Sequence, residues 1–144
     1  MKRLVPYVID AVLVIVFCVI GRNSHHEAVI SAGLFRTLWP FAVGLLLGWV
    51  VALVIHAQGE SEHQFTPVLA EFDAGALWPA GVSAWLVTLI GGMVLRVVSG
   101  QGVEFSFIVV AASVLGLFLL GWRALWLVIR RRGGVSRKGT ARPE

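Results

Sequence analysis

Two ionisable residues lie inside stretches of sequence that are otherwise apolar, and they are the first candidates for chemistry. Asp10 follows Lys2 by eight positions, about 12 Å along a helix, and Arg123 precedes Arg130 by seven positions, about 10 Å. If the basic residues near both chain ends mark one membrane surface, the two side chains lie at matching depth. An unpaired carboxylate there costs on the order of 3 kcal/mol. We therefore predict that the helices carrying them touch and that Asp10 pairs with Arg123.

Two other interpretations of these residues stay open. In the first, Arg123 reaches the lipid headgroups through its long side chain, while Asp10 is protonated or accepts a hydrogen bond from a hydroxyl group or a tryptophan N–H. In the second, Asp10 lines a water-filled cavity and binds a proton or a cation. Separation of the carboxylate from the guanidinium group would exclude the pairing.

A second polar cluster is expected at the opposite membrane surface, and it comprises Arg22, Ser24, His25, His26, Glu27, Arg96 and Ser99. Ser24 and Glu27 have the spacing of a capping box for a short helix that begins at His25. Adjacent helical histidines point about 100° apart, so His25 and His26 are poorly placed to share one metal ion. We expect no metal and no other cofactor. A pH-sensitive site is the remaining interpretation of this cluster.

The motifs that usually mark an enzyme are missing from the sequence. It has no nucleophile and base at triad-like positions, no glycine-rich phosphate loop and no pair of cysteines, because Cys18 is the only one. We therefore expect no enzymatic activity, and a membrane enzyme that uses residues 24–27 is the least favoured class.

The composition indicates what kind of elements must position these residues. Hydrophobic residues make up 58% of the 144 positions and charged residues 14%, with a mean hydropathy of +0.85. A soluble domain has about 25% charged residues, so little material is left for a water-facing surface. The longest apolar stretch, Phe105–Ile129, exceeds the roughly 20 residues that cross a bilayer.

We predict one all-α membrane domain, residues 1–129, built as a four-transmembrane-helix bundle. The expected helices cover residues 4–21, 38–57, 78–98 and 105–129. Trp39-Pro40 and Trp78-Pro79 are expected to begin the second and third helices, since proline suits a first helical turn. The short turn at 99–102 makes the third and fourth helices antiparallel neighbours. Residues 130–144 are expected to be a disordered, basic tail.

The charge distribution predicts orientation and partners. Basic residues at both ends place both termini in the cytoplasm, although Arg22, Arg36 and Arg96 fall at the opposite surface. The expected partners are the lipid bilayer and, for the basic tail, anionic lipid. No nucleic-acid partner is expected. A homodimer is expected if the protein forms a pore, because four short helices enclose little space.

The two halves of the chain are similar enough to suggest a parallel repeat of two helices. Three landmarks recur in the same order, Pro6, Arg22 and Trp49, then Pro79, Arg96 and Trp122. A true repeat predicts that the first helix pair superposes on the second after rotation about the membrane normal. Chance sharing of leucine, glycine and tryptophan is the alternative.

Several short motifs together resemble one known family. They are Asp10 in its apolar run, GRNSHHE at 21–27, WPFAVG at 39–44, GMVLRVVSG at 92–100, FIVV at 107–110 and GWR at 121–123. Over about residues 8–126 the chain is similar to the domain of unknown function 3054, a family of small prokaryotic membrane proteins. The resemblance implies four membrane helices and a prokaryotic plasma membrane. It implies no activity, substrate or ligand.

Two classes of function remain after these exclusions. The leading expectation is a small transporter or channel component that uses the buried Asp10 and Arg123. The alternative is a non-catalytic scaffold or accessory subunit, in which the same residues only hold helices together. Polar groups that converge on a cavity would favour transport, whereas a closed, dry bundle would favour the scaffold.

Overall fold

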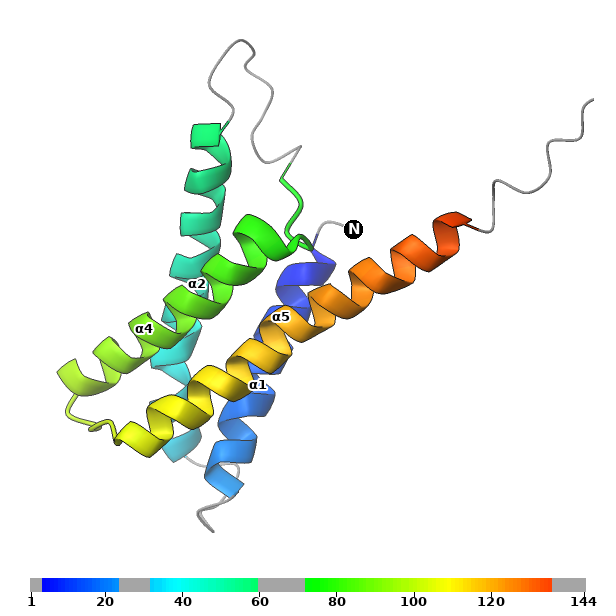
Figure 1. Ribbon diagram of the computed structural model, residues 1–144. Coiled ribbons are helices and arrows are strands. Elements are labelled where there is room, and N and C mark those ends of the chain that lie inside the picture. Colours follow the sequence, from blue (N-terminus) through cyan, green and yellow to red (C-terminus); the bar gives the residue numbers. More distant parts are fainter. Residues whose placement is uncertain (1–3, 24–31, 60–71, 136–144) are drawn as a thin grey trace, which may run out of the picture.

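The protein is an all-α bundle of four helices, as the sequence predicts. A computed structural model describes residues 4–23, 32–59 and 72–135. The helices are α1 (Val5–Asn23), α2 (Ala32–Gly59), α4 (Val82–Val98) and α5 (Phe105–Val135), and a π-helical turn, η1 (Leu77–Gly81), leads directly into α4 (Figure 1). No β-strand occurs within the described ranges.

Helix length and composition identify a membrane protein. Three segments are long and apolar enough to cross a bilayer, Gly33–Gly59, Leu77–Val98 and Phe105–Arg132. The apolar part of α1, Val5–Gly21, is shorter. The whole of α1 has 19 residues, roughly 28 Å of helix, which is close to the hydrocarbon thickness of about 30 Å.

The chain passes back and forth between two ends of the bundle. In Figure 1, α1 and α4 run one way and α2 and α5 run the other. We call the end that holds the start of α1 and the segment 73–81 the pair end. The opposite end, which holds the α4–α5 connection at residues 99–104, is the turn end. The first described residues and the end of α5 both lie toward the pair end.

The closest helix packing joins α2 to α4. A methyl group added to Gly44 would lie 2.9 Å from the Thr88 carbonyl oxygen, and one added to Gly48 would lie 2.9 Å from Ala84 Cα. The GLLLG pair of α2 therefore faces small residues at the same spacing on α4, which lets the two backbones touch. Next to this seam, the rings of Phe17 and Phe41 pack edge to face at 5.2 Å.

Two boundaries differ from the sequence prediction. Helix α2 begins at Ala32, so Pro40 lies inside the helix rather than in its first turn. The turns before it form anyway, with Thr37 Oγ1 donating to the Gly33 carbonyl at 3.1 Å, although proline removes the hydrogen bond to the carbonyl of Arg36 and its ring crowds that carbonyl. Pro79, in contrast, does lie in the opening turn of its span, in η1.

The predicted disordered tail starts too early, because α5 continues through Arg130–Arg132 to Val135. Arginine is a good helix former, and the Arg130 guanidinium stacks on the Trp126 ring one turn earlier, 5.1 Å from its centroid. The rest of the expected tail, residues 136–144, lies outside the described residues. A charged run can end a membrane span without ending its helix.

The predicted repeat is supported only in part by local structure. Its two prolines both lie at the start of a helical span, Pro6 in the first turn of α1 and Pro79 in the π-helical turn η1. The superposition of α1–α2 on α4–α5 stays a prediction.

Candidate functional site: a buried carboxylate and guanidinium pair

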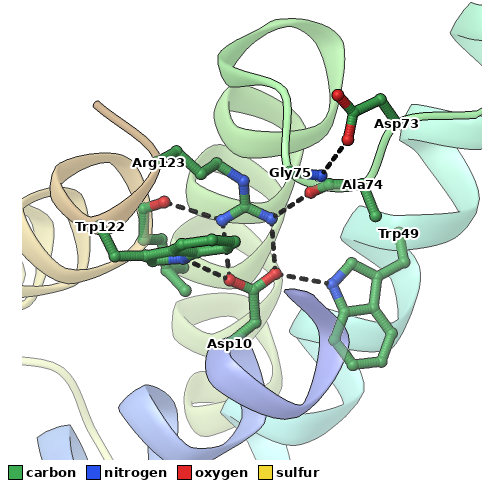
Figure 2. Close-up of polar contacts among 8 residues, drawn as sticks. Asp10, Trp49, Asp73, Ala74, Gly75, Trp122 and Arg123 are labelled. Carbon is green, nitrogen blue, oxygen red and sulfur yellow. Dashed lines mark hydrogen bonds and ion pairs between the residues drawn. The ribbon is translucent and has the colours of Figure 1, made fainter. Parts of the chain in front are cut away.

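The structure brings Asp10 and Arg123 into direct contact near the pair end. Arg123 Nη1 donates to Asp10 Oδ1 at 2.7 Å, and Nη2 donates to Oδ2 at 2.7 Å (Figure 2). The two helices α1 and α5 thus meet through a bidentate ion pair, which is the strongest geometry for these groups. Both side chains are essentially inaccessible to solvent and lipid. Arg123 is buried within the bundle and paired with Asp10, which favours the pairing over an extended side chain.

Two tryptophans complete the surroundings of the carboxylate. Trp49 of α2 donates its Nε1–H to Oδ2 at 3.1 Å, and Trp122 of α5 donates its Nε1–H to Oδ1 at 3.0 Å (Figure 2). Each oxygen therefore accepts two hydrogen bonds. A carboxylate offers about four acceptor sites, so all of them are in use. The carboxylate therefore has no acceptor site left for a further hydrogen-bond donor while these contacts hold.

The guanidinium group uses backbone carbonyls for its other donors. Nη1 also donates to the Leu119 carbonyl at 2.8 Å, one turn earlier in α5. Nη2 also donates at 3.0 Å to the carbonyl of Ala74, which precedes η1. The Asp73 side chain shapes this segment by accepting from the Gly75 N–H at 2.9 Å. The segment before the third span thereby enters the bundle and binds the pair.

One donor of Arg123 stays without a partner. Its Nε is buried and has no hydrogen-bond acceptor among the described residues. It lies beside Gly81, where an added methyl group would be 2.8 Å from Arg123 Cδ and 3.3 Å from Nε. Gly81 therefore provides the space that the guanidinium stem occupies.

Aromatic contacts hold the two indole rings in place. The Arg123 guanidinium carbon lies 4.6 Å from the Trp122 ring centroid, within the range of a cation–π contact. Tyr7 packs edge-on against Trp49, with centroids 4.9 Å apart and ring planes at 81°. These contacts fix the orientation of the two indole N–H donors. The buried pair thereby joins α1, α2, α5 and the segment 73–81 at one point.

The arrangement restricts what the pair can do chemically. Removing one partner of a buried, hydrogen-bonded ion pair typically costs about 3–5 kcal/mol, because the other charge stays buried without compensation. A proton on Asp10 would also disrupt these contacts, because its O–H group would face the N–H donors whose hydrogen bonds the carboxylate oxygen now accepts. The alternative of a water-filled cavity is not supported, because the described residues leave Asp10 with an exposure of 0%.

The second predicted cluster is only partly within the described residues. Arg96 and Ser99 lie together at the turn end, with Ser99 Oγ donating to the Arg96 carbonyl at 3.1 Å. Arg22 belongs to the last turn of α1. Ser24, His25, His26 and Glu27 lie outside the described residues. Within the described ranges, no group of three His, Cys, Asp or Glu residues is placed to hold a metal ion.

Sequence reasoning missed several partners at both sites, namely Trp49, Ala74, Gly81, Gln101 and Trp122. The two tryptophans carried a signal, because they occupy matching positions in the two halves of the chain. A tryptophan N–H was foreseen as a partner of Asp10, although without a residue number. The Ala74 carbonyl belongs to the backbone and left no signal in residue type.

Taken together, the helices and the saturated polar core define a small helical membrane protein organised around a buried ion pair. Residues 7–126 match the profile of a family described as a protein of unknown function, DUF3054. The chain belongs to this family, as its motifs indicated. The comparisons with curated proteins and with solved structures found no match.

Proposed function

We propose that the protein is a non-catalytic membrane scaffold or accessory subunit, in which the Asp10–Arg123 pair fixes the arrangement of the helices. The observation that carries this proposal is the saturation of the carboxylate, which accepts four hydrogen bonds and is fully buried. A structural role needs such a group to keep fixed partners, and the partners here come from α2 and α5.

A transporter, the leading expectation from sequence, has a different requirement. Its ionisable group must exchange a proton or an ion at modest free-energy cost during each cycle. Here exchange at Asp10 would disrupt contacts to α2 and α5 together and leave Arg123 buried without its counter-charge. The geometry therefore supports the alternative function over transport.

The scaffold is proposed to cross a prokaryotic plasma membrane four times with both termini in the cytoplasm. The first described residues and the end of α5 lie toward the same end of the bundle (Figure 1), which fits an even number of crossings. Arg130–Arg132, exposed on the last turns of α5, would then contact anionic lipid at that surface. This function requires neither a nucleic-acid partner nor the homodimer that a pore would need.

The test compares flux with folding in the full chain, purified and reconstituted into liposomes. For a scaffold, wild-type liposomes show no proton or ion flux above protein-free liposomes, and Asp10→Asn lowers the melting temperature of the protein. Asp73→Asn is the matched control, because Asp73 is exposed and an asparagine oxygen still accepts from Gly75 N–H. A flux that Asp10→Asn abolishes without changing the melting temperature would overturn the proposal in favour of transport.

A further inference from the structure

The turn end carries a second guanidinium group that is held in a defined place. Arg96, in the last turn of α4, donates from Nη1 to Gln101 Oε1 at 3.1 Å, and its guanidinium carbon lies 4.8 Å from the Phe107 ring centroid. Gln101 is fixed in turn, since its Nε2 donates to Ser99 Oγ at 3.0 Å. Two glycines with positive φ, Gly100 and Gly102, allow the tight connection that brings Gln101 back to Arg96.

No carboxylate in the described part of the chain pairs with this guanidinium group. Its only described side-chain acceptor is the neutral amide of Gln101, and its buried Nε has no acceptor among the described residues. Neither Arg96 nor Arg36 forms an ion pair with a described carboxylate, and the nearby Glu104 is exposed. Arg123, in contrast, forms an ion pair with Asp10.

A second positive charge lies close to the first. Helices α2 and α4 pack antiparallel, with Gly48 against Ala84 and Gly44 against Thr88. The same register places Arg36 of α2 opposite Arg96 of α4, and the two charges act on each other electrostatically. Two like charges in the low-dielectric rim of a membrane protein repel each other more strongly than they would in water. An anion placed between them would remove this repulsion.

We propose that Arg36 and Arg96 form a binding site for a phosphate-type oxyanion at the turn end of the bundle. Guanidinium groups present parallel N–H donors that match the oxygens of phosphate, and the resulting bonds are charge-assisted. The site lies where α4 ends and α5 begins, at a membrane surface, so the phosphate can belong to a phospholipid headgroup or to an anion in solution. The flanking aromatic residues suit a lipid, since Phe35 and Trp39 are 73% and 41% exposed.

The experiment measures binding to the full chain in detergent micelles by native mass spectrometry and by thermal shift. The two phosphate sources are phosphatidylglycerol and inorganic phosphate, and diacylglycerol with the same acyl chains is the control without phosphate. We expect phosphatidylglycerol to bind and raise the melting temperature while diacylglycerol does not. A shift with inorganic phosphate as well identifies a site that also accepts the free anion. Absence of binding by both phosphate sources overturns the proposal.

Variants show whether the binding belongs to this site. Arg36→Gln is the principal variant, because Arg36 is exposed and its replacement leaves the fold intact. It should weaken binding about tenfold, as expected for loss of a charge-assisted contact. Arg131→Gln, which removes a guanidinium group at the pair end, should change affinity less than about twofold. Equal effects of the two variants would indicate general attraction to a cationic protein and would overturn the site.

Arg96→Lys adds a second, independent measurement. Lysine keeps the positive charge but loses the planar fork and the geometry that Gln101 and Phe107 fix. Binding should fall while the protein still folds. Unchanged binding in Arg96→Lys together with unchanged binding in Arg36→Gln would exclude both arginines as ligands.

Discussion

Trp49 and Trp122 donate their indole N–H groups to opposite oxygens of the same carboxylate, although they lie on different helices and 73 positions apart in the chain. They also occupy corresponding positions in the two similar halves of the sequence. If the predicted repeat holds, the two donors are equivalent and Asp10 lies near its pseudo-twofold axis. The pair itself breaks this symmetry, because the positions that correspond to Asp10 and Arg123 in the other halves are Ser83 and Val50.

The two indole donors should each contribute to stability. Replacing Trp49 or Trp122 with phenylalanine keeps an aromatic ring but removes one hydrogen bond to a charged acceptor, and we expect a loss of about 1.5–3 kcal/mol in the free energy of unfolding. Trp126→Phe is the control, since Trp126 is exposed and contacts Arg130 only by stacking. Denaturation in mixed micelles measures all three. Equal stability of the three variants would contradict the assigned hydrogen bonds.

The ion pair should be strongly coupled in a double-mutant cycle. Asp10→Asn and Arg123→Gln should each lower the free energy of unfolding by about 3–5 kcal/mol, because each leaves the other charge buried. The double variant has no unpaired charge, so its loss should be smaller than the sum of the single losses by at least about 2 kcal/mol. Additive losses would mean that the two side chains do not interact in the membrane.

Gly81 should be intolerant of any side chain. In Gly81→Ala, the new methyl group would meet Arg123 Cδ at 2.8 Å, so we expect a destabilisation of about 1–3 kcal/mol from overpacking. Gly121→Ala is a matched control on α5, because its methyl group would find its nearest neighbour at 3.9 Å. The melting temperatures of the two variants give the comparison. Similar values for both would show that Arg123 does not occupy the space beside Gly81.

The contact between α2 and α4 should be equally sensitive to an added side chain. Gly44→Ala would bring a methyl group to 2.9 Å from a carbonyl oxygen of the facing backbone, which cannot move aside as a flexible side chain can. We expect a loss of about 1–3 kcal/mol. Gly21→Ala, whose added methyl group has no described residue within 4 Å, should be neutral or stabilise α1 by up to about 1 kcal/mol. A stabilising effect of Gly44→Ala would be incompatible with backbone contact at this point.

The contact between Asp10 and Arg123 could be anticipated because the two residues lie at the same depth along the membrane normal and a buried charge needs an opposite partner. Helical rise is constant, so counting residues from a charged surface gives depth for any side chain. The other contacts depend on rotation about each helix axis and on the path of a connecting segment. Trp49 could not be assigned to Asp10 without knowing which face of α2 turns inward, and the carbonyl of Ala74 could not be assigned by residue type at all.

The two misplaced boundaries have a shared cause. Trp39-Pro40 and the arginines after Ile129 indicate where a span meets the membrane surface, but they do not mark the end of a helix. In α2 and α5 the backbone continues its hydrogen-bond ladder past those points, to Ala32 and to Val135. Membrane position and helix length are separate properties, and only the first is encoded in residue polarity.

The unbroken backbone of α5 connects the buried pair mechanically to the basic turns near Val135. In Figure 1 these last turns project beyond the neighbouring helices. A flexible segment would not transmit a force applied at Arg130, whereas a continuous helix transmits it to Arg123, about two turns away. A molecule that binds the arginine-rich end of α5 would therefore transmit force to the point where the other helices are joined.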